Sequence, residues 1–242
     1  MTSVLVTGAN RGIGFGLTRH LLADPSVAIV IATARNVDTA TDLKALSSPN
    51  LHIIQLDAAS EDSIANAAKK VAEIVGENGL DFLINNAGVA YTMKLNEPIA
   101  MAKLNEQLQV NAIAPLIIAN KFYPLLKKTA AMKGSAQIAI ISSTGGSIET
   151  APMVPKDLQL YTGYFMSKAA VNMLTRRISI EWKEDHIRAT CFCPGWVQTD
   201  MGSQRAQLTV DDSTIPLIKL ILSLTEDHNG KYYRYNGETI PW

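Results

Sequence analysis

The 242-residue sequence predicts a single-domain α/β fold with a doubly wound parallel sheet. Short apolar runs rich in β-branched residues alternate with stretches of helical period. The spacing leaves room for a crossover helix between successive runs, as parallel strands require. Hydrophobic residues make up 47% of the chain, which is enough to bury a full core.

Seven apolar runs are short enough to be strands and are separated by stretches that can hold helices. In chain order they are Val4–Thr7, Val27–Ala34, His52–Leu56, Phe82–Asn85, Gln137–Ser142, Ile187–Cys193 and Lys231–Tyr235. The clearest helix is expected after Ser60, because serine is a preferred N-cap residue, and Gly76 suits its end. The apolar residues on one face of this helix are Ile64, Ala67, Ala68, Val71 and Val75.

Residues 202–225 contain no strand candidate, and their apolar run holds Pro216 and the single charge of Lys219. We expect a packed helix kinked near its first turns, or else a flap on the substrate side or a dimer surface.

The balanced charge, 22 Lys and Arg against 22 Asp and Glu, argues against a nucleic-acid binder or an anionic-membrane binder. The longest apolar stretches fall short of the ~20 residues that span a bilayer. Two cysteines cannot form a disulfide framework, and no histidine stands near them at metal-ligand spacing. We therefore expect a cytoplasmic protein that binds no metal, no nucleic acid and no membrane.

The first strand runs into a glycine-rich turn that opens a helix. Its sequence is Gly8-Ala9-Asn10-Arg11-Gly12-Ile13-Gly14. Glycine lets the backbone approach a pyrophosphate, and a helix N-terminus offers N–H groups to an anion. A plain tight turn is the alternative, but the position between strand and helix favours a nucleotide site.

The end of the second strand indicates NADP(H). An Asp or Glu there would hold the free ribose hydroxyls of NAD, whereas Arg35 can bind a 2′-phosphate, helped by Arg11. After the third strand, Asp57 and Ala58 are expected beside the adenine, and a turn-forming aspartate is the alternative.

Tyr164 and Lys168 are four residues apart and share a helix face. A tyrosine with an ordinary pKa near ~10 is a poor acid–base group at neutral pH, and a nearby ammonium lowers that pKa. This pair alone is a weak signal, but it occurs together with polar segments that follow two predicted strands, namely Asn85-Asn86-Ala87-Gly88 and Ser142-Ser143.

In this order the motifs resemble those of the short-chain dehydrogenase/reductase family, over essentially the whole chain. They are Thr7-Gly8-x-x-x-Gly12-x-Gly14, Asn85-Asn86-Ala87-Gly88, Val110-Asn111-Ala112, Ser143, Tyr164-x-x-x-Lys168 and Pro194-Gly195-Trp196-Val197-Gln198-Thr199. The closing segment 236–242 is most similar to sniffer-type carbonyl reductases and the fungal norsolorinic acid ketoreductase branch. The resemblance implies a Rossmann fold with strand order 3-2-1-4-5-6-7.

The resemblance also implies catalytic roles. Tyr164 would be the general acid, and Ser143 would donate a hydrogen bond to the same carbonyl oxygen. Ser142 is the rival of Ser143, although the family places the catalytic residue second. Lys168 would bind the nicotinamide ribose and lower the pKa of Tyr164. Asn111 would hold a relay water, or it could merely join backbone segments.

By the same resemblance, two further segments contact the cofactor. Asn86, Ala87 and Gly88 would line its central part. Beyond the sixth strand, the residues expected near the nicotinamide are Pro194, Gly195, Val197 and Thr199.

The chain has about eight more residues between Ser143 and Tyr164 than many family members have. They fall within residues 145–160, with Pro152 and Pro155, and would form either a wall or lid over the substrate or a surface excursion. The predicted pocket residues are Tyr91, Met93, Ile148, Met153, Tyr161 and Trp196. Their character suggests an apolar carbonyl substrate.

The predicted function is NADPH-dependent reduction of a ketone or aldehyde. The alternatives are an NAD(P)-dependent alcohol dehydrogenase working in oxidation and an NADP(H)-sensing protein without turnover. A homodimer or tetramer would pair the helices around Asn111 and Tyr164. Four residues of the second helix could line that interface or instead face the sheet, and they are Val171, Leu174, Ile178 and Trp182.

Overall fold

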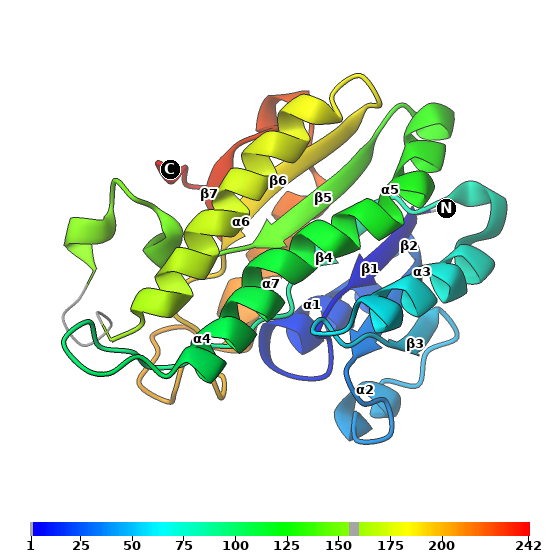
Figure 1. Cartoon of the computed structure of the whole chain (residues 1–242). Helices are drawn as coiled ribbons and strands as arrows, with labels where there is room; N and C mark the ends of the chain where they lie inside the picture. Colours follow the sequence, from blue (N-terminus) through cyan, green and yellow to red (C-terminus); the bar gives the residue numbers. More distant parts are fainter. Residues whose placement is uncertain (1, 155–159) are drawn as a thin grey trace.

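The computed structural model describes residues 2–154 and 160–242, which form a seven-stranded parallel sheet between two layers of helices (Figure 1). The strands are β1 (Thr2–Val6), β2 (Val27–Ala34), β3 (Leu51–Gln55), β4 (Phe82–Asn85), β5 (Ala136–Ile141), β6 (Ile187–Cys193) and β7 (Tyr232–Arg234). Their order is β3-β2-β1-β4-β5-β6-β7, so the predicted order is confirmed. Pro155 of the predicted insertion lies outside the described residues.

Three strands, β2, β4 and β6, begin and end where the sequence predicts. The ends of the others move by one or two residues. β1 starts at Thr2 because Thr2 pairs with Val27 of β2. β5 stops at Ile141, which leaves Ser142 and Ser143 on the connection after the strand.

The helices divide between the two faces of the sheet. They are α1 (Gly12–Ala23), α2 (Thr41–Ala45), α3 (Glu61–Val75), α4 (Met101–Leu108), α5 (Ala114–Lys133), α6 (Thr162–Glu181) and α7 (Val210–Leu222). The buried faces of α3, α5 and α6 form one core with the sheet, and those of α1, α2 and α7 form the other. Among the described residues, no helix is both long enough and apolar enough to cross a membrane.

The helix expected after Ser60 is α3. The Ser60 hydroxyl accepts a hydrogen bond from the backbone N–H of Ser63, as an N-cap should. Four of the five predicted apolar positions are fully buried, namely Ile64, Ala67, Val71 and Val75. The helix ends at Gly76, whose φ of +54° favours glycine.

Helix α7 accounts for most of residues 202–225. Thr209 and Asp212 form a capping box at its start, and Pro216 lies within the helix. Leu217, Ile218 and Ile221 are buried in the core that α7 shares with α1. Helix α7, which would have to move if this segment were a flap, is therefore anchored to the core by apolar packing.

Of the two positions left open for Val171, Leu174, Ile178 and Trp182, the structure shows the one against the sheet. All four pack inward, against the core between α6 and the sheet. The apolar residues that α6 leaves exposed are different ones: Met166, Met173 and Ile180. A homodimer stays a prediction.

Replacing Leu217 with alanine should lower the free energy of unfolding by about 2–5 kcal/mol, because this leucine of α7 is fully buried in the core. Denaturant unfolding measures the change. Ile215→Ala, in the same helix but 39% exposed, is the control and should cost less than about 1 kcal/mol. Equal, small effects of both substitutions would show that α7 is a loosely attached flap.

Candidate active site

The glycine-rich turn sits at the carboxyl edge of the sheet, between β1 and α1. Gly8 has a φ of +63°, a conformation that side chains with a Cβ rarely adopt. A Cβ at Gly14 would lie 2.2 Å from the carbonyl oxygen of Gly8. Close packing of the turn on the start of α1 therefore requires glycine at both positions.

Asn86 fastens this turn to the end of β4. Its side-chain amide donates hydrogen bonds to the carbonyl oxygens of Thr7 (2.9 Å) and Gly8 (3.1 Å). In return, the Thr7 hydroxyl accepts from the backbone N–H groups of Asn86 (2.9 Å) and Ala87 (3.1 Å). The two predicted cofactor segments are thus held together by four hydrogen bonds.

The connection after β6 lies against the same turn. A Cβ at Gly12 would come within 3.1 Å of the Thr199 side chain. Arg11 donates to the carboxylate of Asp200 at 2.7 Å, although both side chains are largely exposed. Val197 is buried, and the indole N–H of Trp196 donates to the carbonyl of Gly202 at 2.6 Å.

Arg35 and Asp57 lie at the neighbouring strand ends. Arg35 directly follows β2 and is exposed. Asp57 accepts a hydrogen bond from the backbone N–H of Ala59 at 2.9 Å, which is the turn-forming role given as the alternative. Ala58, between Asp57 and Ala59 in the sequence, is buried. A contact of Asp57 with adenine stays a prediction.

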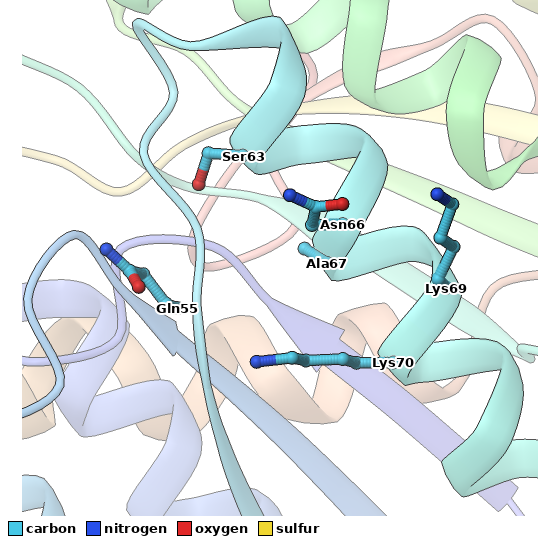
Figure 2. A pocket seen from close by; sticks show the side chains of 6 residues that line it. All are labelled: Gln55, Ser63, Asn66, Ala67, Lys69 and Lys70. Atoms are coloured by element: carbon cyan, nitrogen blue, oxygen red, sulfur yellow. The ribbon is translucent and has the colours of Figure 1, made fainter.

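Two open grooves adjoin these strand ends, and both carry positive side chains. One, of about 480 Å³, is lined by Gln55, Ser63, Asn66, Ala67, Lys69 and Lys70 (Figure 2). The other, of about 560 Å³, is lined by Arg35, Asn36, Val37, Asp38, Ile53, Ile54, Gln55 and Lys70. Of the predicted cofactor residues, the second groove includes Arg35, and Tyr164 lines neither groove.

The catalytic candidates meet between α6 and the end of β5. Tyr164 and Lys168 lie one helical turn apart, with the Lys168 ammonium 5.5 Å from the centroid of the Tyr164 ring. The ammonium of Lys168 donates to the carbonyl oxygen of Ile141 at 2.8 Å. The side chain of Ser143 hydrogen-bonds that of Tyr164. The predicted trio is therefore brought together.

The structure distinguishes Ser143 from its neighbour. The Ser142 hydroxyl is buried and donates to Asn172 at 2.7 Å, away from Tyr164. Ser143 is partly exposed, and its backbone carbonyl accepts a hydrogen bond from the hydroxyl of Tyr232 on β7. Of the two serines, Ser143 is the one placed to act beside Tyr164.

Burial governs the proton affinities of this group. It raises the pKa of Tyr164 above its ordinary value; Cys193 adds to the rise, and the hydrogen bond from Ser143 partly offsets it. Burial also lowers the pKa of Lys168 to about 8. The expectation that Lys168 lowers the Tyr164 pKa is therefore wrong for this structure: the pKa is raised, and the hydrogen bond with Ser143 is what opposes the rise. Tyr164 keeps its proton at neutral pH, as a general acid must.

Asn111 lies in a π-helical turn, Gln109–Ile113, between α4 and α5. Its amide accepts from the backbone N–H of Val89 (2.8 Å) and donates to the carbonyl of Val89 (2.8 Å) and the hydroxyl of Ser167 (3.0 Å). A Cβ at Gly88 would lie 3.3 Å from the Asn111 amide oxygen and 3.8 Å from the Lys168 ammonium. The side chain therefore joins backbone segments beside Lys168, and the relay water stays a prediction.

The predicted pocket residues fall into two groups. Met93 is buried and bridges to Tyr161 at the start of α6. The backbone N–H of Tyr91, two residues earlier, donates to the side chain of Gln107 at 2.6 Å. Ile148 and Met153 are instead 79% and 81% exposed. The pocket, and the alternative of wall or surface excursion, stay predictions.

Several residues that shape the site were not predicted from the sequence. Thr7 and Thr33 bind backbone N–H groups of the glycine-rich turn and of Asn86. Gln107 holds Tyr91, and Asn172 holds Ser142. Two of them carried a signal: Thr7 opens the glycine-rich motif, and Asn172 lies four residues after Lys168 and so shares its helix face.

Comparison with known proteins agrees with this geometry. The family model for short chain dehydrogenases matches residues 2–208. A short-chain dehydrogenase of Pyricularia oryzae is 34% identical, over 100% of this chain and 98% of its own length. The NADPH-bound carbonyl reductase from chicken fatty liver is 37% identical, with a TM-score of 0.94 over 100% of this chain and 94% of its own. The carbonyl reductase Sniffer of D. melanogaster is 32% identical, with a TM-score of 0.93 and full coverage of both chains.

Proposed function

We propose that this chain, which belongs to the short-chain dehydrogenase family, is an oxidoreductase that uses NADPH to reduce a ketone or an aldehyde. The observation that carries the proposal is the meeting of Ser143, Tyr164 and Lys168 at the carboxyl edge of the sheet. The similarity along the whole chain to two carbonyl reductases supports it.

The residues at this edge fit a dinucleotide cofactor. In the part of the chain that the structure describes, α1 starts without a side-chain cap and without an acidic residue in its first turn. Its first N–H groups therefore suit a pyrophosphate, which the glycine-rich turn lets come close. Arg35, with Lys70 in the same groove, supplies positive charge for a 2′-phosphate. We therefore infer NADP(H) as the cofactor.

Each member of the trio has a defined task in the reduction. When bound, the cofactor supplies the hydride that the carbonyl carbon receives. Tyr164 donates a proton to the carbonyl oxygen, and burial keeps its hydroxyl protonated at neutral pH until the transfer. Ser143 hydrogen-bonds the same oxygen and stabilises the negative charge that develops there. The ammonium of Lys168, held by Ile141, favours the tyrosinate that remains.

The substrate is inferred to be an apolar carbonyl compound. Met93 pairs with Tyr161 directly before α6, which carries Tyr164, and the backbone N–H of Tyr91 is held by Gln107 of α4. Ile148 and Met153 add apolar surface on the connection after Ser143. The free, buried thiols of Cys191 and Cys193 suit a reducing compartment, so we infer a cytoplasmic enzyme.

Tyr164→Phe should lower kcat for NADPH-dependent reduction at least ~100-fold, because it removes the proton donor and retains the ring. NADPH oxidation against aliphatic, aromatic and quinone carbonyls measures the effect. Tyr123→Phe is the matched control, because it removes a tyrosine hydroxyl of α5 that donates to Asp185. This variant should keep the wild-type rate.

The outcome also separates the two alternatives. Tight NADPH binding without turnover of any carbonyl would favour a sensing protein. Turnover only in the direction of alcohol oxidation would favour a dehydrogenase. Equal rates for wild type and Tyr164→Phe would contradict the assigned role of the tyrosine.

Arg35→Ala should raise KM for NADPH by roughly 10–100-fold and leave KM for NADH within about threefold, because a charged contact to the 2′-phosphate is lost. Steady-state kinetics with both cofactors measures the ratio. Arg177→Ala, an exposed arginine paired with Glu181 on α6, is the control and should change neither constant. An unchanged preference for NADPH in Arg35→Ala would refute the role of Arg35.

A further inference from the structure

Asn172 is a buried polar residue of α6 to which the reaction above gives no task. It follows Lys168 by four residues, so the same helix face carries Tyr164, Lys168 and Asn172. Its exposed fraction is 4%. A buried amide must find partners, because a hydrogen-bonding group left unmet in the interior destabilises the fold.

Three hydrogen bonds satisfy this amide, and they reach three different segments. Its oxygen accepts from the hydroxyl of Ser142 at 2.7 Å and from the thiol of Cys191 at 3.2 Å. Its nitrogen donates to the backbone carbonyl of Gly146 at 2.9 Å. One side chain therefore ties α6 to the end of β5, to β6 and to the short 3-10 turn Thr144–Gly146.

That turn is the support of Ser143. The Ser143 hydroxyl accepts from the N–H of Gly145 at 3.2 Å, and the N–H of Gly146 donates to the Ser143 carbonyl at 2.7 Å. The turn also presses on α6, since a Cβ at Gly146 would lie 2.7 Å from the backbone carbon of Lys168. A shift of the Gly146 carbonyl would therefore move Ser143 relative to the helix that carries Tyr164.

We propose that Asn172 is a positioning residue for the reaction: it holds the turn 143–146 against α6 and so sets the Ser143 hydroxyl beside Tyr164. The proposal rests on the proposed function. Both hydroxyls must reach one carbonyl oxygen, and a misplacement of about 1 Å in such an arrangement can cost ~100-fold in rate. The amide N–H donated to Gly146 is the contact that fixes this spacing.

The test is a double-mutant cycle of Asn172→Ala and Ser143→Ala, followed by single-turnover oxidation of NADPH at saturating carbonyl substrate. Asn172→Ala should lower the rate about 10–100-fold in the wild-type background and leave KM for NADPH within about threefold. In the Ser143→Ala background the same substitution should have less than about a twofold effect, because there is no serine hydroxyl left to misplace.

Two further variants separate positioning from stability. Ser179→Ala, the matched control, removes a buried hydroxyl of α6 that donates to Arg176 within the helix, and it should keep the rate. Asn172→Asp keeps the size and the accepting oxygen but replaces the amide that donates to Gly146. If Asn172→Ala does not fold, Asn172→Asp takes its place and should show the same loss.

An equal rate loss from Asn172→Ala in both backgrounds, or no loss at all, would overturn the proposal. A crystal structure of the variant gives a readout that needs no turnover: we expect the Ser143 hydroxyl to move by about 1 Å or more from its place beside Tyr164. An unmoved Ser143 would also overturn it. Failure of the proposed function is a separate result, since the wild-type protein itself would then fail to oxidise NADPH with any of the carbonyl compounds tested.

Discussion

The burial of one face of α6 against the ends of β5 and β6 is the constraint on which the site depends. That face carries Tyr164, Lys168 and Asn172, and the last two are almost completely enclosed. An ammonium in such a place needs a polar partner, and the carbonyl of Ile141 supplies it. Because β5 ends at Ile141, the same carbonyl also fixes where the connection to Ser143 begins.

This enclosure sets the chemistry as well as the geometry. Desolvation holds the proton on Tyr164 and makes Lys168 easier to deprotonate than an ordinary lysine. At the same edge of the sheet, the turn between β1 and α1 has no side chain at Gly8 or Gly14. Asn86 hydrogen-bonds this turn to the end of β4. The glycine-rich turn and Tyr164 thus lie at the same edge of the sheet, as the proposed reduction requires.

Much of this could be predicted from the sequence, since the strand runs and the motifs are local patterns. β2, β4 and β6 were located to the residue, because apolar runs bounded by turns define them. The inward face of α6 could not be assigned from the sequence: Val171 and Ile178 have the spacing of any amphipathic helix, and spacing alone does not say whether a sheet or a second subunit covers them. Asn172 was missed because its partners on β5, β6 and the turn are distant in sequence and meet only in the folded chain.

The pH dependence of the single-turnover reduction rate, at saturating NADPH, tests the central claim most directly. Below about pH 8 both Tyr164 and Lys168 hold their protons, so the rate constant should be level between pH 6 and about pH 7.5. As the pH rises through the Lys168 pKa of about 8, the ammonium is lost and the rate constant should fall, approaching tenfold per pH unit. A rate constant that stays level or rises between pH 7 and pH 9.5 would contradict the account.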